Sequence, residues 1–458
     1  QKYFLSVTLR RDASSKFGEN TRWGTFPSYA IAYTFTEEPY MDWARDFLDF
    51  GKVRLSYGKS GKQFEYPYFA FGVLIVNNVP FHGNQTITPY WPDGLINPKL
   101  SWEETKQFDA GLDLEFFGNR LSFELDYYYR YTDKLLAQVT LPGDYNAYIS
   151  QWQNAYAISN QGIELQIKAD FVRSEKLHWD FSFNIARNWN RFEKSNNGMD
   201  FTNLASKHNL NIIGKPLNGI YVYNDQGYYN SQDEVPLYYV NGRRKYLSSL
   251  GNQIYTPGDR RIQDVDGNGQ VATMVPLLED RVYGGSPLPL AFGGIATTLK
   301  WKGIDVNLLF SYKLGRHVLN AGRGASVGTI LRANTAEMMV PILADLDKVS
   351  FWQKPGDNTD FPINELENGK NNFATNLKSN VEKINYLKLK SISIGYTLPV
   401  FPKQSKHYAR VFMSVENVFT ITNSSSPDPE SIDIVTGVDS NNNYPLATRY
   451  TLGLTLNL

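Results

Sequence analysis

The feature that most constrains this chain is a regular alternation of apolar and polar residues. In residues 121–132 the odd positions hold Leu, Phe or Tyr, while the even positions are polar or charged except for Tyr128. The same alternation recurs in residues 163–171 and 304–312. Because successive side chains of a β-strand point to opposite faces, each segment would form a strand with one apolar and one polar face. We therefore expect strands that meet water, or a wet lumen, on one side only.

The lengths of the strands and of their connections narrow the fold class. About twelve alternating segments can be counted, and most reach the roughly 9–11 residues that a tilted transmembrane strand needs. Short links at 117–120 and 302–303 alternate with long ones at 64–99, 196–287 and 322–382. Short turns at one end and long loops at the other are typical of outer-membrane barrels. The predicted fold is all-β, an antiparallel transmembrane β-barrel with long extracellular loops.

One irregularity in the alternation is informative. Between Leu389 and Ile392 the apolar residues move from odd to even positions. A strand that keeps its direction but changes its apolar phase must gain or lose one residue relative to its neighbours. We expect a β-bulge here, or a strand that twists past the rim of the barrel.

Composition excludes several classes of protein. The 46 basic and 46 acidic residues cancel, so no net field would attract nucleic acid. The absence of cysteine excludes disulfides, thiolate metal sites and cysteine nucleophiles. The five histidines are scattered, and neither a phosphate-binding glycine loop nor a nucleophile elbow is present, so we do not expect an enzyme. No apolar run reaches the roughly 18 residues of a membrane-spanning helix.

One acidic loop begins like a calcium-binding loop. Oxygen-bearing side chains fall at its first, third and fifth positions, a glycine at its sixth and Gln270 at its seventh. The acid that completes such a loop is missing, because Val275 occupies the twelfth position, and Glu279 or Asp280 could replace it only if the loop folds back. Two interpretations stay open: Ca²⁺ bound in an extracellular loop, or an Asx/Gly turn without a metal. The candidate ligands are Asp264, Asp266, Asn268 and Gln270.

Aromatic residues also gather near amides and acids in the long connections. Aromatic faces stack on sugar rings or peptide side chains, and neighbouring amides fix hydroxyl groups, so these rings are candidate ligand contacts. The alternative is that they form the aromatic girdle of a barrel or pack on one another. The candidates are Tyr66, Tyr68, Phe69, Tyr90, Trp91, Tyr148 and Trp152.

A set of characteristic strings runs in order along nearly the whole chain. Examples are Thr8-Leu9-Arg10-Arg11-Asp12, Val53-Arg54-Leu55-Ser56-Tyr57-Gly58, Asn97-Pro98-Lys99-Leu100-Ser101-Trp102-Glu103, Asn160-Gln161-Gly162-Ile163-Glu164 and Asp264-Val265-Asp266-Gly267-Asn268-Gly269. As a set, they resemble the SusC/RagA-type TonB-dependent transporters of Bacteroidetes outer membranes.

The resemblance implies an integral outer-membrane barrel of about 22 strands with an internal plug. It also implies import of oligosaccharides or peptides, energised through TonB, beneath a SusD-like surface lipoprotein. Residues 1–458 would then be the C-terminal part of the barrel, with about the last 12 strands. The plug, the TonB-contacting segment and the first strands would lie in another chain or upstream. Apart from the calcium of the acidic loop, no cofactor is expected.

The longest connections suggest where a partner would bind. Residues 196–287 and 322–382 are far longer than strand closure needs, and in the family such loops seat the lipoprotein lid. The expected anchors are Tyr221, Tyr223, Tyr228, Tyr229, Tyr238 and Tyr239. The alternative is that the loops fold over the pore without a partner.

Two other functions stay open. A SusC-like barrel could serve as a structural or assembly scaffold in an outer-membrane complex without transport. A soluble glycan-binding β-domain is disfavoured, because its strands would be about six residues long with compact turns.

Overall fold

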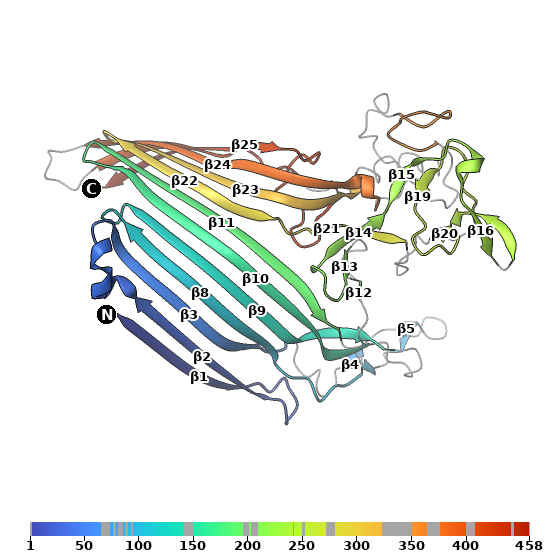
Figure 1. Ribbon diagram of the computed structural model, residues 1–458, viewed down its shortest axis with the longest axis horizontal. Helices are drawn as coiled ribbons and strands as arrows, with labels where there is room; N and C mark the ends of the chain where they lie inside the picture. The colour runs from blue at the N-terminus through green and yellow to red at the C-terminus, as the bar shows by residue number, and fades with distance from the viewer. Residues whose placement is uncertain are drawn as a thin grey trace.

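The chain forms one large curved sheet with a cluster of small strands beyond one end of it (Figure 1). The structure is a computed structural model that describes residues 2–65, 74–76, 79–80, 86–87, 90–92, 95–141, 150–195, 201–202, 209–240, 242–249, 252–271, 280–322, 350–363, 376–399, 408–440 and 444–457. No helix in these residues is both long enough and apolar enough to cross a membrane.

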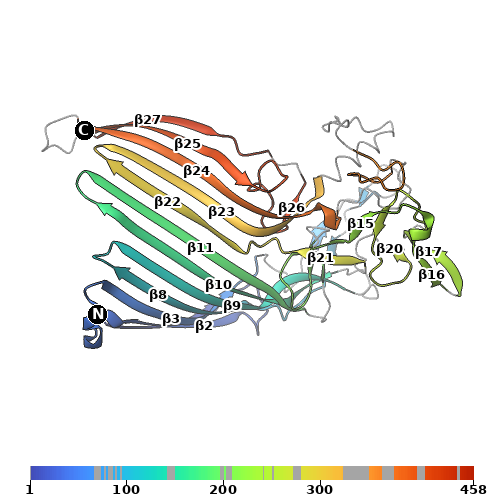
Figure 2. The ribbon, with the colours of Figure 1, turned by 45° about the horizontal axis from the view of Figure 1, so that its top comes forward.

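Thirteen strands make up the large sheet, of which β26 (Val438–Asp439) is a short parallel addition to one strand. The other twelve follow one another in chain order, each antiparallel to its neighbour, with β1 and β27 at the two ends (Figures 1 and 2). Their bounds are β1 (Tyr3–Ala13), β2 (Trp23–Thr34), β3 (Leu48–Lys62), β8 (Glu103–Phe116), β9 (Leu121–Thr140), β10 (Ser150–Arg173), β11 (Leu177–Lys194), β22 (Ala291–Trp301), β23 (Ile304–Asn320), β24 (Val381–Pro399), β25 (Tyr408–Thr422) and β27 (Arg449–Asn457). The predicted long antiparallel strands are therefore confirmed.

The register of the sheet separates apolar from polar side chains. Leu125 of β9 lies opposite Leu165 of β10, which lies opposite Ile185 of β11, so apolar residues form a row across the strands. One position along, Asp126 lies opposite Glu164 in a polar row. Leu125 and Ile163 on the apolar face are 39% and 44% exposed, as expected for a surface that contacts lipid. The polar face therefore lines the lumen.

Charged side chains on the lumen face pair across strands. The Arg54 guanidinium of β3 lies 2.7 Å from a carboxylate oxygen of Asp113 on β8 and 3.0 Å from one of Asp126 on β9. Arg54 is therefore paired with carboxylates of the adjacent strand β8 and of the next strand, β9.

The connections differ sharply between the two ends of the sheet. The turn between β22 and β23 consists of Lys302 and Gly303, both with positive φ (47° and 87°), which is the backbone of a primed two-residue hairpin turn. The long connections all lie at the other end, and a fourth one, residues 423–448, was not anticipated. Short turns mark the periplasmic end and long loops the extracellular end.

The phase reversal in β24 is a β-bulge, as predicted. Leu389 pairs with Phe419 and Ser391 pairs with Glu416, so Lys390 stands opposite two residues of β25. The register to β23 shifts at the same place. One of the two opposing residues, Asn417, adopts a left-handed backbone with φ 53°, which relieves the mismatch.

The remaining elements are short. The connection between β2 and β3, residues 35–47, is longer than the other described turns at the periplasmic end and contains the 3-10 helices η1 (Phe35–Glu37) and η2 (Pro39–Ala44). The first long connection contains β4 (Leu74–Val76), β5 (Val79–Pro80), β6 (Thr86–Ile87) and β7 (Tyr90–Pro92). The later connections contain β12 (Phe201–Thr202), β13 (Asn209–Asn211), β14 (Gly219–Tyr223), β15 (Asp225–Tyr228), η3 (Gln232–Glu234), β16 (Leu237–Val240), β17 (Arg243–Tyr246), β18 (Ser248–Ser249), β19 (Arg260–Ile262), β20 (Gln270–Val271), β21 (Arg281–Gly285) and η5 (Lys378–Asn380).

Candidate ligand- and partner-binding region

Two long connections combine at the extracellular end into a small unit with its own apolar core. We call the described residues of 209–285 and 350–380 the loop subdomain. Its core consists of Tyr223, Tyr229, Val235, Leu247, Tyr255, Ile262, Val271 and Leu377, each at most 2% exposed. The amide of Tyr223 donates to the carbonyl of Asn376 at 2.9 Å, which joins the two connections. The subdomain is therefore a folded structure rather than a pair of independent loops.

The six tyrosines predicted as partner anchors have different environments. Tyr223 and Tyr229 are core residues, 0% and 1% exposed, and burial raises the pKa of the Tyr229 hydroxyl to about 12. Tyr221 is also buried, against Tyr283. The side chain of Tyr239 is 73% exposed. The role of these rings in partner binding stays a prediction, and Tyr239 is the ring that offers most surface for it.

Tyr228 and Tyr238 complete the set. Tyr228 lines a cavity and donates from its hydroxyl to the carbonyl of Thr359 at 3.3 Å. Tyr238 packs against the core. Burial is the main cause that raises the pKa of its hydroxyl to about 12, and a hydrogen bond to Asp264 is the second.

Most of the predicted ligand-contacting aromatics lie outside the described residues. This applies to Tyr66, Tyr68, Phe69 and Tyr148, and for Tyr90 and Trp91 only the backbone, in β7, is described. Trp152 is described: its ring packs edge-on against Phe64 with centroids 4.9 Å apart, beside a buried cluster at the rim of the sheet. This contact agrees with the alternative in which Trp152 packs on another aromatic residue. Ligand contact by the seven candidate aromatic residues stays a prediction.

The acidic loop folds back, as calcium binding would require. Carboxylate oxygens of Asp264, Asp266 and Asp280 lie within 4.8 Å of one another, and Asp280 is fully buried. Glu279, the other residue considered for completing the loop, lies outside the described residues. Three converging carboxylates form the hard-oxygen donor set that Ca²⁺ prefers.

The same loop also has the hydrogen bonds of an Asx turn. Asp264 accepts from the amides of Gly267 and Gly269 at 2.8 and 2.9 Å. Asn268 donates from Nδ2 to Asp266 at 2.6 Å, and its Oδ1 accepts from the Gln270 amide at 2.7 Å. These bonds hold the carboxylates in place with or without a cation, so calcium binding stays a prediction.

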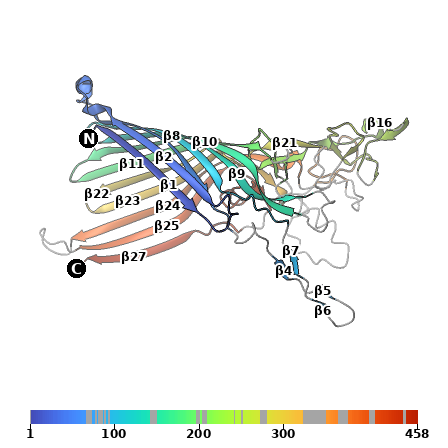
Figure 3. The same ribbon diagram turned by 90° about the horizontal axis from the view of Figure 1, so that it is seen from below.

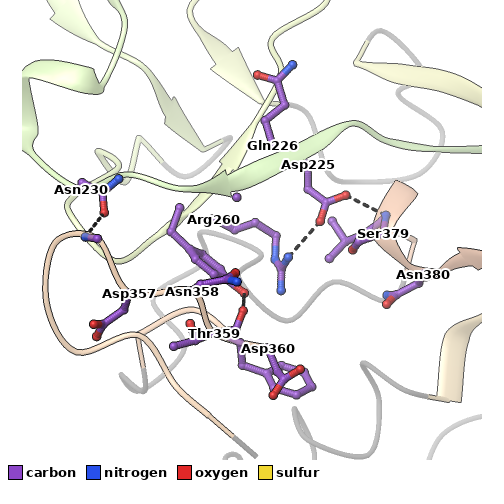
Figure 4. Close-up of a pocket in the computed structure, with 15 residues that line it drawn as sticks. Asp225, Gln226, Asn230, Arg260, Asp357, Asn358, Thr359, Asp360, Ser379 and Asn380 are labelled. Atoms are coloured by element: carbon purple, nitrogen blue, oxygen red, sulfur yellow. Dashed lines mark hydrogen bonds and ion pairs between the residues drawn. The ribbon is translucent and has the colours of Figure 1, made fainter.

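A polar cavity of about 520 Å³ opens between β15, residues 356–361 and η5 (Figure 4). A buried ion pair forms part of its wall: Arg260 Nη1 lies 2.9 Å from Asp225 Oδ2. The other carboxylate oxygen of Asp225 accepts from the Ser379 amide at 2.9 Å. The Arg260 guanidinium also stacks 5.3 Å from the centroid of the Tyr228 ring. The chain's own residues fix this wall, so the cavity is a preformed recess with polar walls.

Residues 423–440 form a further structured part of the extracellular end that sequence reasoning missed. The fully buried Arg316 side chain of β23 donates to three backbone carbonyls, two of them in this segment. Lys388 of β24, only 3% exposed, lies 3.2 Å from Asp428 and 2.9 Å from Glu430. Buried cations need such partners. In the sequence, the only sign of this structured segment is weak: Asp428 and Glu430, separated by one residue, lie in a stretch rich in Ser and Asp.

The large antiparallel sheet has one apolar and one polar face, short turns at one end and the folded loop subdomain at the other. These features define an integral outer-membrane β-barrel protein. Residues 1–321 match the family of TonB dependent receptor-like β-barrels. The chain belongs to this family. Its place is the outer membrane. The predicted family, fold and location are confirmed.

Individual relatives support the assignment along the full length of the chain. TonB-dependent receptor P3 of Formosa agariphila is 29% identical over 483 residues, which covers 99% of this chain and 44% of that protein. TonB-dependent receptor SusC of Bacteroides thetaiotaomicron is 26% identical, covering 99% of this chain and 42% of that protein. A chain of the RagAB peptide transporter has the same fold, with a TM-score of 0.74 at 22% identity over 100% of this chain and 46% of its own length. The chain thus spans less than half the length of these relatives.

Proposed function

We propose that the whole protein imports oligosaccharides or peptides across the outer membrane, energised through TonB. The observation that carries this proposal is that the large sheet has an apolar face for lipid on one side and a polar face on the other. A barrel with a polar lumen provides a path for hydrophilic nutrients through the membrane. One structural neighbour is named a peptide transporter, which supports the peptide class. The oligosaccharide class rests on the resemblance of the sequence.

The barrel requires strands beyond the twelve of this chain's main path. Among the described residues, β1 pairs only with β2, and β27 only with β25. Each edge leaves backbone N–H and C=O groups unpaired, which costs several kcal/mol per group in lipid. We propose that further strands pair with both edges and that a plug fills the completed lumen.

A SusD-like lipoprotein is the proposed partner at the extracellular end. The loop subdomain supports this because it is folded, lies beyond the strands and exposes Leu237 and Tyr239. A permanent lid of this kind would bury an area in the class above about 2,000 Å².

A scaffold role without transport is the second candidate. The folded loop subdomain would serve equally well to hold other outer-membrane proteins. An enzymatic role is not proposed, since the family is one of receptors and transporters.

Growth experiments separate import from scaffolding. Cells that lack the gene should lose growth on one class of nutrient, single oligosaccharides or short peptides, and regain it when the intact protein is restored. Unchanged growth on both classes, together with loss of other outer-membrane proteins from the membrane fraction, would support the scaffold.

A further inference from the structure

A two-stranded hairpin projects from the loop subdomain at the end of the molecule opposite the chain termini (Figures 1 and 3). It consists of β16 and β17, in which Leu237 pairs with Tyr246 and Val240 with Arg243. Because the large sheet spans the membrane, the hairpin is at the extracellular extreme, away from the lipid that the strands contact.

Tyrosines fix the hairpin to the subdomain. Tyr238 and Tyr246 pack against the buried core, and Tyr238 lies against the acidic loop, where its Cγ would be 3.1 Å from a Cβ placed on Gly269. A two-stranded hairpin is only marginally stable by itself, so these contacts give it a fixed position.

Leu237, Tyr239 and Arg244 share one face of the hairpin, the face opposite the one that holds Tyr238. Leu237 is 49% exposed and Tyr239 is 73% exposed. Arg244, opposite Tyr239, donates from Nε to the Tyr239 hydroxyl at 3.1 Å, and its guanidinium lies 5.9 Å from the ring centroid. Tyr and Arg are among the residues enriched in interface hot spots.

The hairpin also concentrates positive charge. Arg243, Arg244 and Lys245 are consecutive and exposed, and among the described residues none of them forms an ion pair. Arg244 lies on the face with Leu237 and Tyr239, whereas Arg243 and Lys245 lie on the other face. The projecting hairpin therefore presents positive charge on both faces, which attracts an anionic surface. In this position, beyond the strands, that surface belongs to a protein rather than to the bilayer.

We propose that the β16–β17 hairpin docks on an acidic patch of an extracellular partner protein. Arg244 pairs with a carboxylate on the same face as the apolar contacts of Leu237 and Tyr239, and Arg243 and Lys245 pair with carboxylates that flank the other face of the hairpin. The inference rests on the proposed function, in which a SusD-like lipoprotein covers this end.

The test uses the intact protein in detergent and its SusD-like lipoprotein, purified separately. One variant carries Arg243→Glu, Arg244→Glu and Lys245→Glu. The matched control carries Arg261→Glu, Lys354→Glu and Lys378→Glu, which are exposed positions elsewhere on the subdomain with the same change in charge. A milder variant with Gln at positions 243, 244 and 245 guards against misfolding, and heat-modifiability on gels verifies the barrel.

The hairpin Glu variant should bind the lipoprotein about tenfold or more weakly than the wild type at physiological salt, and the Gln variant should fall between them. Wild-type affinity should decline with added NaCl, and the decline should be shallower in both hairpin variants, because fewer charges remain to be screened. The control should bind like the wild type.

Equal binding by the hairpin variants and the control would overturn the docking inference while leaving the lid in place. No binding by the wild type would overturn the lid and the inference together. Hairpin-dependent binding to vesicles rich in anionic lipid, with lipoprotein binding unchanged in the variants, would assign the hairpin to a membrane surface and contradict the proposal.

Discussion

Arg410 of β25 and Asp305 of β23 form a two-pronged ion pair that crosses the intervening strand β24. The Arg410 Nε atom lies 3.0 Å from Asp305 Oδ1, and Nη2 bonds the second carboxylate oxygen. The pair passes over Gly395, where an added Cβ would lie 2.4 Å from Arg410 Nη2 and 2.6 Å from Asp305 Oδ1. Glycine is thus required here because the ion pair occupies the space of a side chain.

This geometry predicts that Gly395→Ala weakens the barrel by displacing the ion pair. Loss of charge-assisted hydrogen bonds costs about 1.5–3 kcal/mol, and the midpoint of heat-modifiability of the assembled protein should fall accordingly. In an Asp305→Ala background the same glycine substitution should cost clearly less, because part of the clash is already gone. If Gly395→Ala costs the same in both backgrounds, the ion pair is not the reason that residue 395 is glycine.

Neighbouring residues of β10 point to opposite faces of the sheet, so the same substitution should have very different costs at the two positions. Leu165→Arg places a charge on the apolar face and should cost roughly 2–4 kcal/mol in unfolding experiments in bilayers. Gln166→Arg, on the lumen face, is the matched control and should cost far less. Spin labels that report Ile167 in water and Lys168 in lipid would reverse the assignment.

The acidic loop predicts weak, specific binding of Ca²⁺. Extracellular sites of this kind have dissociation constants of about 10⁻⁴–10⁻³ M, so ~1 mM Ca²⁺ should protect the loop subdomain from proteolysis. Asp264→Asn and Asp280→Asn should abolish the protection, whereas Asp233→Asn, an exposed acid in η3, should retain it. Protection that is identical with Ca²⁺ and with chelator would favour the metal-free Asx turn.

The buried tyrosines predict that the loop subdomain loses stability at high pH. In the folded state burial raises the Tyr229 pKa to about 12, whereas an unfolded tyrosine titrates near 10. Above pH 10 the unfolded chain loses its proton first, so the stability that is complete below pH 10 declines as pH rises towards 12. This group contributes at most about 2–3 kcal/mol to the decline.

Proteolysis of the subdomain between pH 9 and 12, with the protease rate corrected on an unfolded substrate, measures that decline. Tyr229→Phe should make it shallower without removing it, because Tyr223 and Tyr255 also have pKa values raised by burial. An unchanged slope in Tyr229→Phe would show that its hydroxyl does not ionise on unfolding.

The two open sheet edges predict that residues 1–458 do not form a stable barrel alone. Expressed by itself, this piece should give no heat-modifiable, protease-resistant species, whereas the intact protein should give both. A stable monomeric pore from the piece would show that its own strands close the barrel.

The large sheet could be predicted well from the sequence, because the alternation of residues within one strand decides which side chains lie on which face. The alternation around Leu125 and Leu165 sets which face is apolar, and the phase change after Leu389 locates the bulge at Lys390. The loop subdomain was harder to predict, because burial there depends on contacts between distant segments. Nothing local distinguishes Tyr229, which is buried, from Tyr239, which is exposed.

The most direct test of the central proposal is uptake of a labelled nutrient, chosen from the class on which growth depends, by cells that express the intact protein. We predict accumulation that requires both the protein and TonB, and that stops when the TonB-contacting segment is deleted although the barrel stays in the outer membrane. Accumulation at the same rate without TonB, or none with every component present, would contradict the assignment as a TonB-dependent importer.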